Sequence, residues 1–461
     1  MSRQTLKAQP ALKGQPGPTA DARRAEGRAL RGSVPRSSHA AWEAAADRPD
    51  PIGLLEDSNR SRIAALVPIR YGRMLTSPFA FLRGSAMMMA ADLAATPVTG
   101  IQVQMCGDAH LGNFGTYATP ERNQVFDAND FDETLPGPWE WDIKRLAASI
   151  VVAGRQNGFS PAGIKQAALR CLCTYRERMW EFGDMGHLHV WYSSVDARGM
   201  LKQVGRANRP FVTRELEKAH AHTNVKVFPQ LVKKSNGQYT IKEEPPLITH
   251  LDDAERASFV QALLEGYQES LSDERRILLQ RYCIVDLAQK VVGVGSVGTR
   301  CGIGLLLGNK DGDPLFLQIK EARRSVLEPY LTRSAYENQA QRVVSGQHLM
   351  QAASDIFLGW TTSGSVDYYI RQLRDRKETP TIEQLTEQDF TQYVGLCGWA
   401  LARAHARSGD PALISGYLGR SDQFDRAVAS FAQTYADQTE RDHAALVKAV
   451  GSGRIHAETL S

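Results

Sequence analysis

The stretch CGDAHLGNFGTYATPERNQVFDANDFDET, residues 106–134, holds the densest group of polar and acidic side chains in the chain. The residues before it, IQVQM, alternate apolar and polar side chains, which is typical of a strand that leads into a loop. That loop carries Asp108, His110 and Asn113. A second short strand is predicted over NQVF, and it is followed by the acidic residues Asp127, Asp130, Asp132 and Glu133.

These carboxylates repel one another unless a cation or a set of hydrogen-bond donors neutralises them. Carboxylate and amide oxygens with few imidazoles favour Mg²⁺ over Zn²⁺. The pattern therefore predicts a magnesium site. The alternative is a turn region in which the carboxylates cap backbone amides.

A glycine-rich motif, GVGSVG, contributes Gly293, Gly295, Ser296 and Gly298. A dinucleotide-binding turn requires a helix directly afterwards, but here two alternating segments follow, separated by a DG turn. This order predicts a strand hairpin with Lys320 on its second strand, so that backbone amides lie over phosphates and the lysine reaches them. The alternative is that the glycines only permit a tight hairpin and that Lys320 is solvated.

A carboxylate on the next predicted helix is expected to orient Lys320. Glu337 follows Lys320 by 17 positions and is the predicted partner. Glu328 is the alternative, and an unpaired surface position for Glu337 also stays open.

The segment GDAHLGN resembles the HGDxHxxN catalytic loop of aminoglycoside-phosphotransferase-type kinases, with Cys106 in place of the first histidine. The resemblance implies that Asp108 is the base that accepts a proton from a substrate hydroxyl and that Asn113 binds Mg²⁺. It also implies that Asp127 is the second metal ligand, with Asp130 as the alternative.

In the same resemblance, Asp142 supports the catalytic loop through the backbone amides of that loop. The glycine-rich motif and Lys320 follow the catalytic loop instead of preceding it, which indicates a circular permutation. The segment VDYYIRQLRD then corresponds to the hinge strand, and Tyr369 and Arg371 are expected beside the adenine of ATP.

Four longer segments, RYGRMLTSPFAFLRG, CGDAHLGNFG, FDANDFDETLPGPWEWDIKRLAAS and ENQAQRVVSGQHLMQAASDIFLGW, together resemble the bacterial domain of unknown function 2252. The expected fold is α+β, a kinase-like two-lobe fold in a circularly permuted order. Residues 1–50 are expected to be a mobile basic arm and residues 51–285 a helical catalytic lobe. Residues 286–380 form the predicted β-rich nucleotide lobe, and residues 381–461 the helices that pack on the catalytic lobe.

The composition restricts the class of protein. The first 50 residues carry nine Lys and Arg against five Asp and Glu, which accounts for the whole net charge of +4, so no nucleic-acid partner is expected. The six cysteines form no CxxC pair, the N-terminus has no apolar signal segment, and SAMMMAADLAA is too short to span a bilayer. The sequence therefore predicts a cytoplasmic protein without a membrane partner, and it leaves the oligomeric state open.

The predicted function is an ATP- and Mg²⁺-dependent phosphotransferase that acts on a hydroxyl of a small molecule or protein. One alternative is a kinase-like protein that binds nucleotide without turnover, because of Cys106. Another is a metallophosphoesterase, since GDAH resembles its GDxH motif, although the upstream DxH and downstream Asn-His pair of that class are missing. A rival catalytic loop, HARSGD at residues 405–410, lacks a following metal-binding Asn, so His405 is expected on a helix face and Asp410 as a helix cap.

Overall fold

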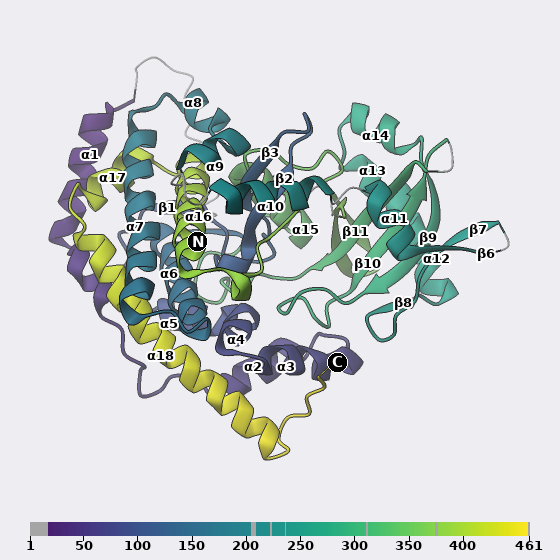
Figure 1. The fold of residues 1–461 in the computed structure, drawn as a ribbon, viewed down its shortest axis with the longest axis horizontal. Coiled ribbons are helices and arrows are strands. Elements are labelled where there is room, and N and C mark those ends of the chain that lie inside the picture. The colour runs from purple at the N-terminus through teal and green to yellow at the C-terminus, as the bar shows by residue number, and fades with distance from the viewer. Residues whose placement is uncertain are drawn as a thin grey trace.

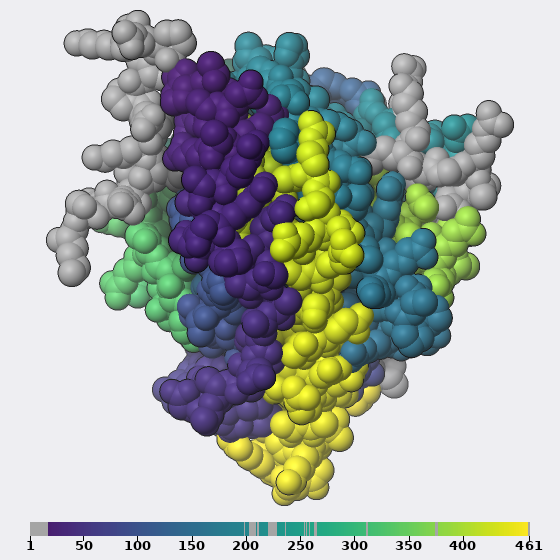
Figure 2. Space-filling view, turned by 90° about the vertical axis from the view of Figure 1, so that its left-hand side faces the viewer, coloured from purple at the N-terminus to yellow at the C-terminus, as the bar shows by residue number. Residues whose placement is uncertain are grey.

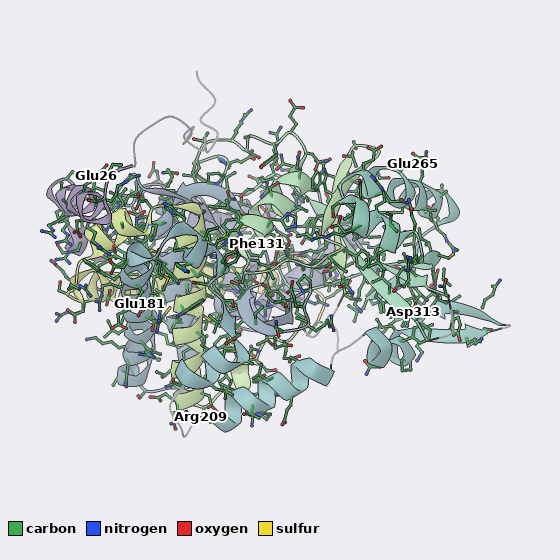
Figure 3. All side chains as sticks on the ribbon, turned by 90° about the horizontal axis from the view of Figure 1, so that it is seen from above. Glu26, Phe131, Glu181, Arg209, Glu265 and Asp313 are labelled. Carbon is green, nitrogen blue, oxygen red and sulfur yellow. The ribbon has the colours of Figure 1, made fainter. Side chains whose placement is uncertain are left out.

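The computed structural model describes residues 17–203, 209–221, 224–235, 237–309, 312–373 and 377–459. The protein is a mixed α+β structure with several sheets. A helix-rich part and a sheet-rich part lie side by side along the longest axis (Figure 1). Seen from above, the buried Phe131 lies between Glu181 of the helix-rich part and Asp313 of the sheet-rich part (Figure 3).

Long helices build the helix-rich part: α6 (Trp139–Gln156), α7 (Pro161–Asp184), α16 (Glu387–Ser408), α17 (Pro411–Leu418) and α18 (Gln423–Gly451). Ser160 caps α7 by accepting a hydrogen bond from the Gly163 N–H, and Pro161 fits the first helical position. The last three helices are packed on α6 and α7, so the C-terminal end of the chain covers the segment that follows the acidic residues.

Residues 17–50 are packed on the rest of the protein, in contrast to the mobile arm that the composition predicts for residues 1–50. Helix α1 (Ala20–Ala29) packs against α17, and a Cβ added at Gly27 would lie 2.0 Å from the Leu413 carbonyl oxygen. Arg48 donates hydrogen bonds of 2.7–2.9 Å to Asp92 and Asp442. Figure 2 shows this N-terminal segment in purple alongside the C-terminal helices in yellow. Small residues and arginines make these contacts, which is why a search for large apolar residues misses them.

Four shorter helices follow: α2 (Pro51–Asn59), α3 (Val67–Leu75), α4 (Pro78–Gly84) and α5 (Ala86–Leu93). The sequence predicts one helix that opens at Ser77 and closes before Pro97, and Ser77 does cap α4. The structure divides it at Ser85, whose backbone is not helical. Arg70 Nη2 donates a hydrogen bond to the Gly84 carbonyl oxygen at 2.7 Å. That oxygen would accept a backbone hydrogen bond if the helix continued.

The acidic region is built on short antiparallel strands. The pairs are β1 (Gln102–Met105) with β4 (Leu135–Pro138) and β2 (Phe114–Ala118) with β3 (Gln124–Ala128), and β5 (Val195–Asp196) adds to β3. The strands predicted over IQVQM and NQVF are confirmed.

Besides the two-stranded pair of β6 (Val232–Ser235) and β7 (Gln238–Ile241), the sheet-rich part contains a six-stranded antiparallel sheet in the order β12-β13-β11-β10-β9-β8. Its strands are β8 (Ile248–His250), β9 (Cys283–Lys290), β10 (Cys301–Leu307), β11 (Pro314–Ala322), β12 (Gly359–Ser363) and β13 (Val366–Gln372). The hairpin predicted around the DG turn is β10–β11. This sheet begins before residue 286, because β8 and the first residues of β9 lie within the span that was expected to be helical.

Helix α15 (Gln339–Met350) connects β11 to β12 and contacts the sheet. One face of the sheet buries Leu317 and Ile370 in a cluster with Tyr267, and the other buries Phe316 and Leu305 in a second cluster. Because both faces are covered, residues 315–317 of β11 form an uninterrupted apolar run.

The remaining elements lie between α7 and β9. They are α8 (His187–Tyr192), α9 (Ala197–Gln203), α10 (Arg209–Ala221), α11 (Asn224–Leu231), β6 (Val232–Ser235), β7 (Gln238–Ile241), α12 (Asp253–Leu264), α13 (Gly266–Glu269) and α14 (Asp273–Leu279). Short 3₁₀ helices occur at Leu30–Gly32, Arg36–Ala40, Ala64–Leu66, Leu111–Asn113 and Ile382–Gln384. None of the helices in the described ranges has the length and apolar character that a bilayer-spanning segment requires.

Candidate active site

The loop between β1 and β2 is fixed by Asp142 near the start of α6. The Asp142 carboxylate accepts hydrogen bonds from the backbone N–H groups of Cys106 at 2.7 Å and Gly107 at 2.9 Å. His405 Nε2 lies 3.2 Å from the same carboxylate, and its Nδ1 lies 2.8 Å from the Tyr175 hydroxyl. Asp142 therefore supports the loop in the manner that the kinase resemblance implies.

The rival motif HARSGD does not form a second catalytic loop. His405 is buried in α16, and Asp410 caps α17 by accepting a hydrogen bond from the Leu413 N–H at 2.9 Å. Both positions agree with the structural roles predicted for them.

Asp108 lies on the fixed loop and lines a cavity. Its carboxylate accepts a hydrogen bond from Arg145 Nε at 2.5 Å, and its carbonyl oxygen accepts one from Asn113 Nδ2 at 2.8 Å. Burial raises the pKa of Asp108, and the nearby Arg145 opposes that rise. A carboxyl whose pKa is raised is a stronger base when it is ionised.

The two predicted metal ligands in residues 127–133, which we call the acidic run, lie in different surroundings. Asp130 lines the cavity together with Asp108 and Asn113. Asp127 does not: it is buried on β3, accepts a hydrogen bond from Arg403 of α16 at 2.6 Å and accepts another from the Ala352 N–H at 2.8 Å. Asp130 therefore replaces Asp127 as the expected metal ligand, because the Asp127 carboxylate does not line the cavity and is neutralised by the buried Arg403.

Lys320 reaches the acidic run across the boundary between the two parts. Its Nζ lies 2.7 Å from Asp132 Oδ2 and 3.8 Å from Asp130 Oδ2. Burial alone would lower the pKa of Lys320, but the two carboxylates raise it well above its usual value. The sequence placed Asp132 in the acidic cluster but gave no sign that it pairs with a lysine 188 positions away.

The prediction that Glu337 pairs with Lys320 is wrong. Residues 323–338 form an irregular connection, Asn338 caps α15, and Glu337 is exposed just outside the helix. Helix α15 instead sends the buried Arg342 toward the acidic run, where it donates to the carbonyl oxygens of Asp132 at 2.9 Å and Thr134 at 2.6 Å. Glu328 is not the partner either, since Asp132 takes that place.

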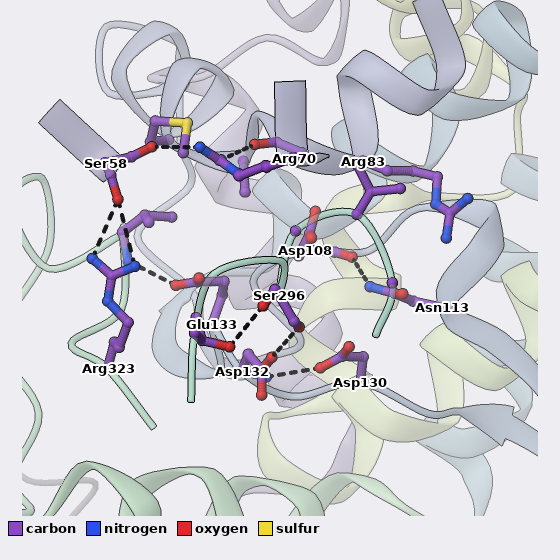
Figure 4. A pocket seen from close by; sticks show the side chains of 18 of the residues that line it. Ser58, Arg70, Arg83, Asp108, Asn113, Asp130, Asp132, Glu133, Ser296 and Arg323 are labelled. Atoms are coloured by element: carbon purple, nitrogen blue, oxygen red, sulfur yellow. Dashed lines mark hydrogen bonds between the residues drawn. The ribbon is translucent and has the colours of Figure 1, made fainter. Parts of the chain in front are cut away.

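The glycine-rich motif is the connection between β9 and β10. Gly293, Gly295 and Ser296 line the cavity opposite Asp108, and Ser296 Oγ lies 3.4 Å from Asp132 Oδ2 (Figure 4). Gly298 has a φ of +84°, a backbone conformation that favours glycine.

Residues next to α2 and in α3 hold this connection from outside. Arg62 Nη1 donates to the Val297 carbonyl oxygen at 2.5 Å, and the Ile63 N–H donates to the Gly298 carbonyl oxygen at 2.8 Å. Arg73 donates to the Gly293 carbonyl oxygen. No sequence pattern predicts these contacts, because the two segments are more than 200 residues apart.

Tyr369 and Arg371 lie on β13 and do not line the cavity. The Tyr369 hydroxyl donates to Asp132 Oδ1 at 2.6 Å, and Arg371 Nη1 donates to the Asn129 carbonyl oxygen at 3.1 Å. Both side chains are therefore engaged with the acidic run, and the contact with adenine that the resemblance implies stays a prediction.

The cavity encloses about 190 Å³ and is bounded by α2–α5, the 106–113 loop, the acidic run and the glycine-rich connection. The oxygen atoms of Asn113, Asp130 and Asp132 suit a hard cation such as Mg²⁺. Within the described ranges, no group of three or more His, Cys, Asp or Glu side chains is placed to hold a metal ion alone. Mg²⁺ commonly binds to one or two carboxylates together with substrate phosphates, so these residues fit the ion as a partner of a nucleotide.

The comparisons identify the family of the chain. The sequence model described as "Uncharacterized protein conserved in bacteria (DUF2252)" matches residues 62–449, and the chain belongs to this family. No curated protein and no solved structure matches the chain. The match covers the acidic run, the glycine-rich connection and Lys320.

Proposed function

We propose that this protein is an ATP- and Mg²⁺-dependent phosphotransferase with a circularly permuted, kinase-like arrangement of two lobes. One observation carries the proposal: the glycine-rich connection and Lys320 meet Asp108, Asn113 and Asp130 around one cavity or at its edge. Phosphoryl transfer needs this combination of backbone amides, a lysine, metal-binding oxygens and a base.

The order of elements in the sheet-rich part supports the kinase-like interpretation. The glycine-rich connection joins β9 to β10, Lys320 follows on β11, and α15 comes next before β12 and β13. In protein kinases the lysine likewise lies on the third strand of the nucleotide lobe, and a helix follows it. The catalytic loop precedes these elements here, which is the permuted order.

Each residue has a role in this proposal. Asp108 accepts the proton of the substrate hydroxyl, and its raised pKa suits that role. Lys320 and the backbone amides of residues 293–298 hold the phosphates, while Asn113 and Asp130 supply oxygens for Mg²⁺. When bound, Mg²⁺ neutralises charge on the transferred phosphoryl group. Asp132 orients Lys320 in place of a helix glutamate.

Cys106 departs from the histidine of the resembling family. Its Sγ donates to the Asp130 carbonyl oxygen at 3.2 Å, so the side chain still joins the catalytic loop to the acidic run. The Asp108–Arg145 ion pair favours a second candidate, a protein that binds nucleotide without turnover, because a paired carboxylate is a weaker base.

ADP formation distinguishes the two candidates. Wild-type protein is incubated with ATP and Mg²⁺ and with a panel of small hydroxyl compounds, and the same assay is repeated with Asp108→Asn. We expect Asp108→Asn to lose about 10²- to 10⁴-fold in rate while its ATP affinity is kept. ATP binding without ADP formation for every compound would favour the non-catalytic candidate, and absence of ATP binding would refute both.

A further inference from the structure

The charged side chains around the cavity are unevenly neutralised. Five carboxylates line it: Asp108, Asp130, Asp132, Glu133 and Glu321. Five arginines line it as well: Arg62, Arg70, Arg83, Arg323 and Arg324. The two sets do not pair with each other.

The carboxylates have partners of their own. Arg145 pairs with Asp108, and Lys320 pairs with Asp132 and lies 3.8 Å from Asp130. Arg300 lies 3.5 Å from Glu321. Glu133 accepts a hydrogen bond from the Val326 N–H at 2.7 Å.

Within the described ranges, the five arginines that line the cavity have no carboxylate partner in direct contact. In the part of the chain that the structure describes, no carboxylate oxygen lies within 4.0 Å of the five guanidinium groups. Arg62, Arg70 and Arg323 donate only to carbonyl, hydroxyl and amide oxygens. Burial and, to a smaller extent, the neighbouring Arg323 lower the pKa of Arg62 to about 10. Arg62, Arg83 and Arg323 are half-buried, and arginines that are withdrawn from water normally have anionic partners, whereas these three lack a carboxylate in direct contact within the described ranges.

Arg83 and Arg324 leave their hydrogen-bond donors unused in the part of the chain that the structure describes. Neither donates a hydrogen bond within the described ranges, and Arg83 Nε is buried without a partner. Arg83 ends α4 and lies beside the catalytic loop, since a Cβ added at Gly112 would lie 3.3 Å from its Nε. Figure 4 shows Arg83 near Asn113 and Asp108, whereas Arg70 and Arg323 lie near Ser58.

We propose that the phosphate acceptor is itself anionic: a small molecule that bears a phosphate or carboxylate group, which Arg83 and Arg324 bind, besides the hydroxyl that meets Asp108. Guanidinium groups bind both oxyanions through paired, charge-assisted hydrogen bonds. This inference rests on the proposed function, because it assigns the arginines to the acceptor side of the same cavity.

The position of Arg83 favours the acceptor over the nucleotide. The proposed phosphate-binding groups are Lys320 and the 293–298 backbone, whereas Arg83 lies next to the loop of Asp108. The acceptor hydroxyl must approach that carboxylate to lose its proton. An anionic group on the acceptor is therefore within reach of Arg83 when the hydroxyl is placed for reaction.

The test is a calorimetric titration of inorganic phosphate into protein saturated with Mg²⁺ and a non-hydrolysable ATP analogue, in 150 mM NaCl as an excess of competing anion. Wild type is compared with Arg83→Gln, Arg324→Gln and Arg83→Lys. Arg60→Gln is the control, since Arg60 is exposed outside the cavity and its removal deletes the same charge. Arg324 is exposed, so its variant is expected to fold even where Arg83→Gln does not.

We expect phosphate to bind to wild type and to Arg60→Gln, and to bind at least about tenfold more weakly to Arg83→Gln and Arg324→Gln. Arg83→Lys keeps a point charge and is expected to lie between them. The affinity for the ATP analogue stays within about twofold in all variants.

Three results would overturn the proposal. In the first, phosphate does not bind. In the second, phosphate binds only to nucleotide-free protein and the analogue displaces it, so that the arginines belong to the nucleotide. In the third, the analogue fails to bind while Arg83-dependent phosphate binding persists. That result would refute the phosphotransferase together with the acceptor role, and would leave an anion site of another kind.

Discussion

Asp142 holds the 106–113 loop in shape, because its two carboxylate oxygens each accept one backbone N–H from residues 106–107. We expect Asp142→Ala to lower the free energy of unfolding by about 3 kcal/mol, since two buried donors lose their acceptor. Urea unfolding measures this loss. Glu337→Ala is the matched control, because Glu337 is exposed, and it should change stability by no more than about 0.5 kcal/mol. Equal stability of the two variants would show that Asp142 does not support the loop.

Asp127 and Asp130 are three positions apart. We expect substitution of Asp127 to lower stability and substitution of Asp130 to lower ATP affinity. Asp127→Asn breaks a buried ion pair with Arg403 and should cost about 3–5 kcal/mol in urea unfolding. Asp130→Asn should keep the stability of wild type but lower the affinity for ATP in the presence of Mg²⁺ by about tenfold or more.

Affinity measurements on the folded fraction of Asp127→Asn complete this comparison. A loss of Mg²⁺-dependent ATP affinity that appears only in Asp127→Asn would restore the original assignment of Asp127 as the metal ligand. The sequence could not separate the two residues, because both carboxylates follow the predicted strand NQVF, and only the position of Arg403 on α16 shows that Asp127 is neutralised.

In the proposed function, the connection between β9 and β10 binds phosphate through its backbone amides, so its shape should matter for ATP affinity. Gly298 has a φ of +84°, and a Cβ there would lie 3.1 Å from the Arg62 Cβ. Gly298→Ala should cost about 1–2 kcal/mol of stability. It should also weaken ATP binding by about tenfold, as expected if one hydrogen bond to phosphate is lost.

Gly237→Ala provides the control for that experiment. Gly237 has a φ of +80° in the β6–β7 turn, and nothing lies within 4 Å of an added Cβ. Its stability should fall by a similar amount while its ATP affinity stays unchanged. If both alanine variants bind ATP like wild type, the shape of the 293–298 connection is irrelevant to nucleotide binding.

Elements with a clear local pattern were predictable. The strands around the acidic run and the β10–β11 hairpin follow from alternating side chains and turn residues. The division between α4 and α5 was not, because it depends on Arg70, a residue of a different helix, and its bond to the Gly84 carbonyl oxygen. The late start of α15 at Gln339 likewise moved Glu337 out of the helix that was expected to present it.

At the scale of the whole molecule, the N-terminal segment belongs to the folded structure. His39 is fully buried, and its Nε2 lies 2.7 Å from the Tyr417 hydroxyl. Burial lowers the pKa of His39 to about 3. In the unfolded chain His39 binds a proton near pH 6.5, whereas in the folded protein it stays neutral. The free energy of unfolding therefore decreases as the pH falls below about 6.5.

Protonation of His39 in the unfolded chain lowers the free energy of unfolding by about 2 kcal/mol at pH 5. Between pH 7 and pH 5, wild type should lose that much more stability than His39→Gln, in thermal or urea unfolding followed at both pH values. His456→Gln is the control, because His456 is exposed, and it should keep the pH dependence of wild type. The same pH dependence in His39→Gln and wild type would mean that residues 36–40 are not packed in solution.

The motifs that form the site were predictable from the sequence, but the contacts between their side chains were not. The catalytic loop, the acidic run, the glycine-rich motif and Lys320 were each recognisable from residue type and spacing. That Lys320 pairs with Asp132, and that arginines from α3 and the α2–α3 connection hold the glycine-rich connection, depends on how distant segments pack. Periodicity and spacing describe neighbours along the chain and carry no information about such contacts.

The proposed nucleotide site joins segments almost 200 residues apart in the chain, and calorimetric titration of ATP with and without Mg²⁺ shows whether they act together. We expect Mg²⁺-dependent binding in wild type and in the surface control Glu337→Gln. Binding should weaken about 10- to 100-fold in both Lys320→Ala and Asp130→Asn, since each removes a charged contact. Absence of ATP binding in folded wild type, or unchanged binding in either variant, would contradict the account.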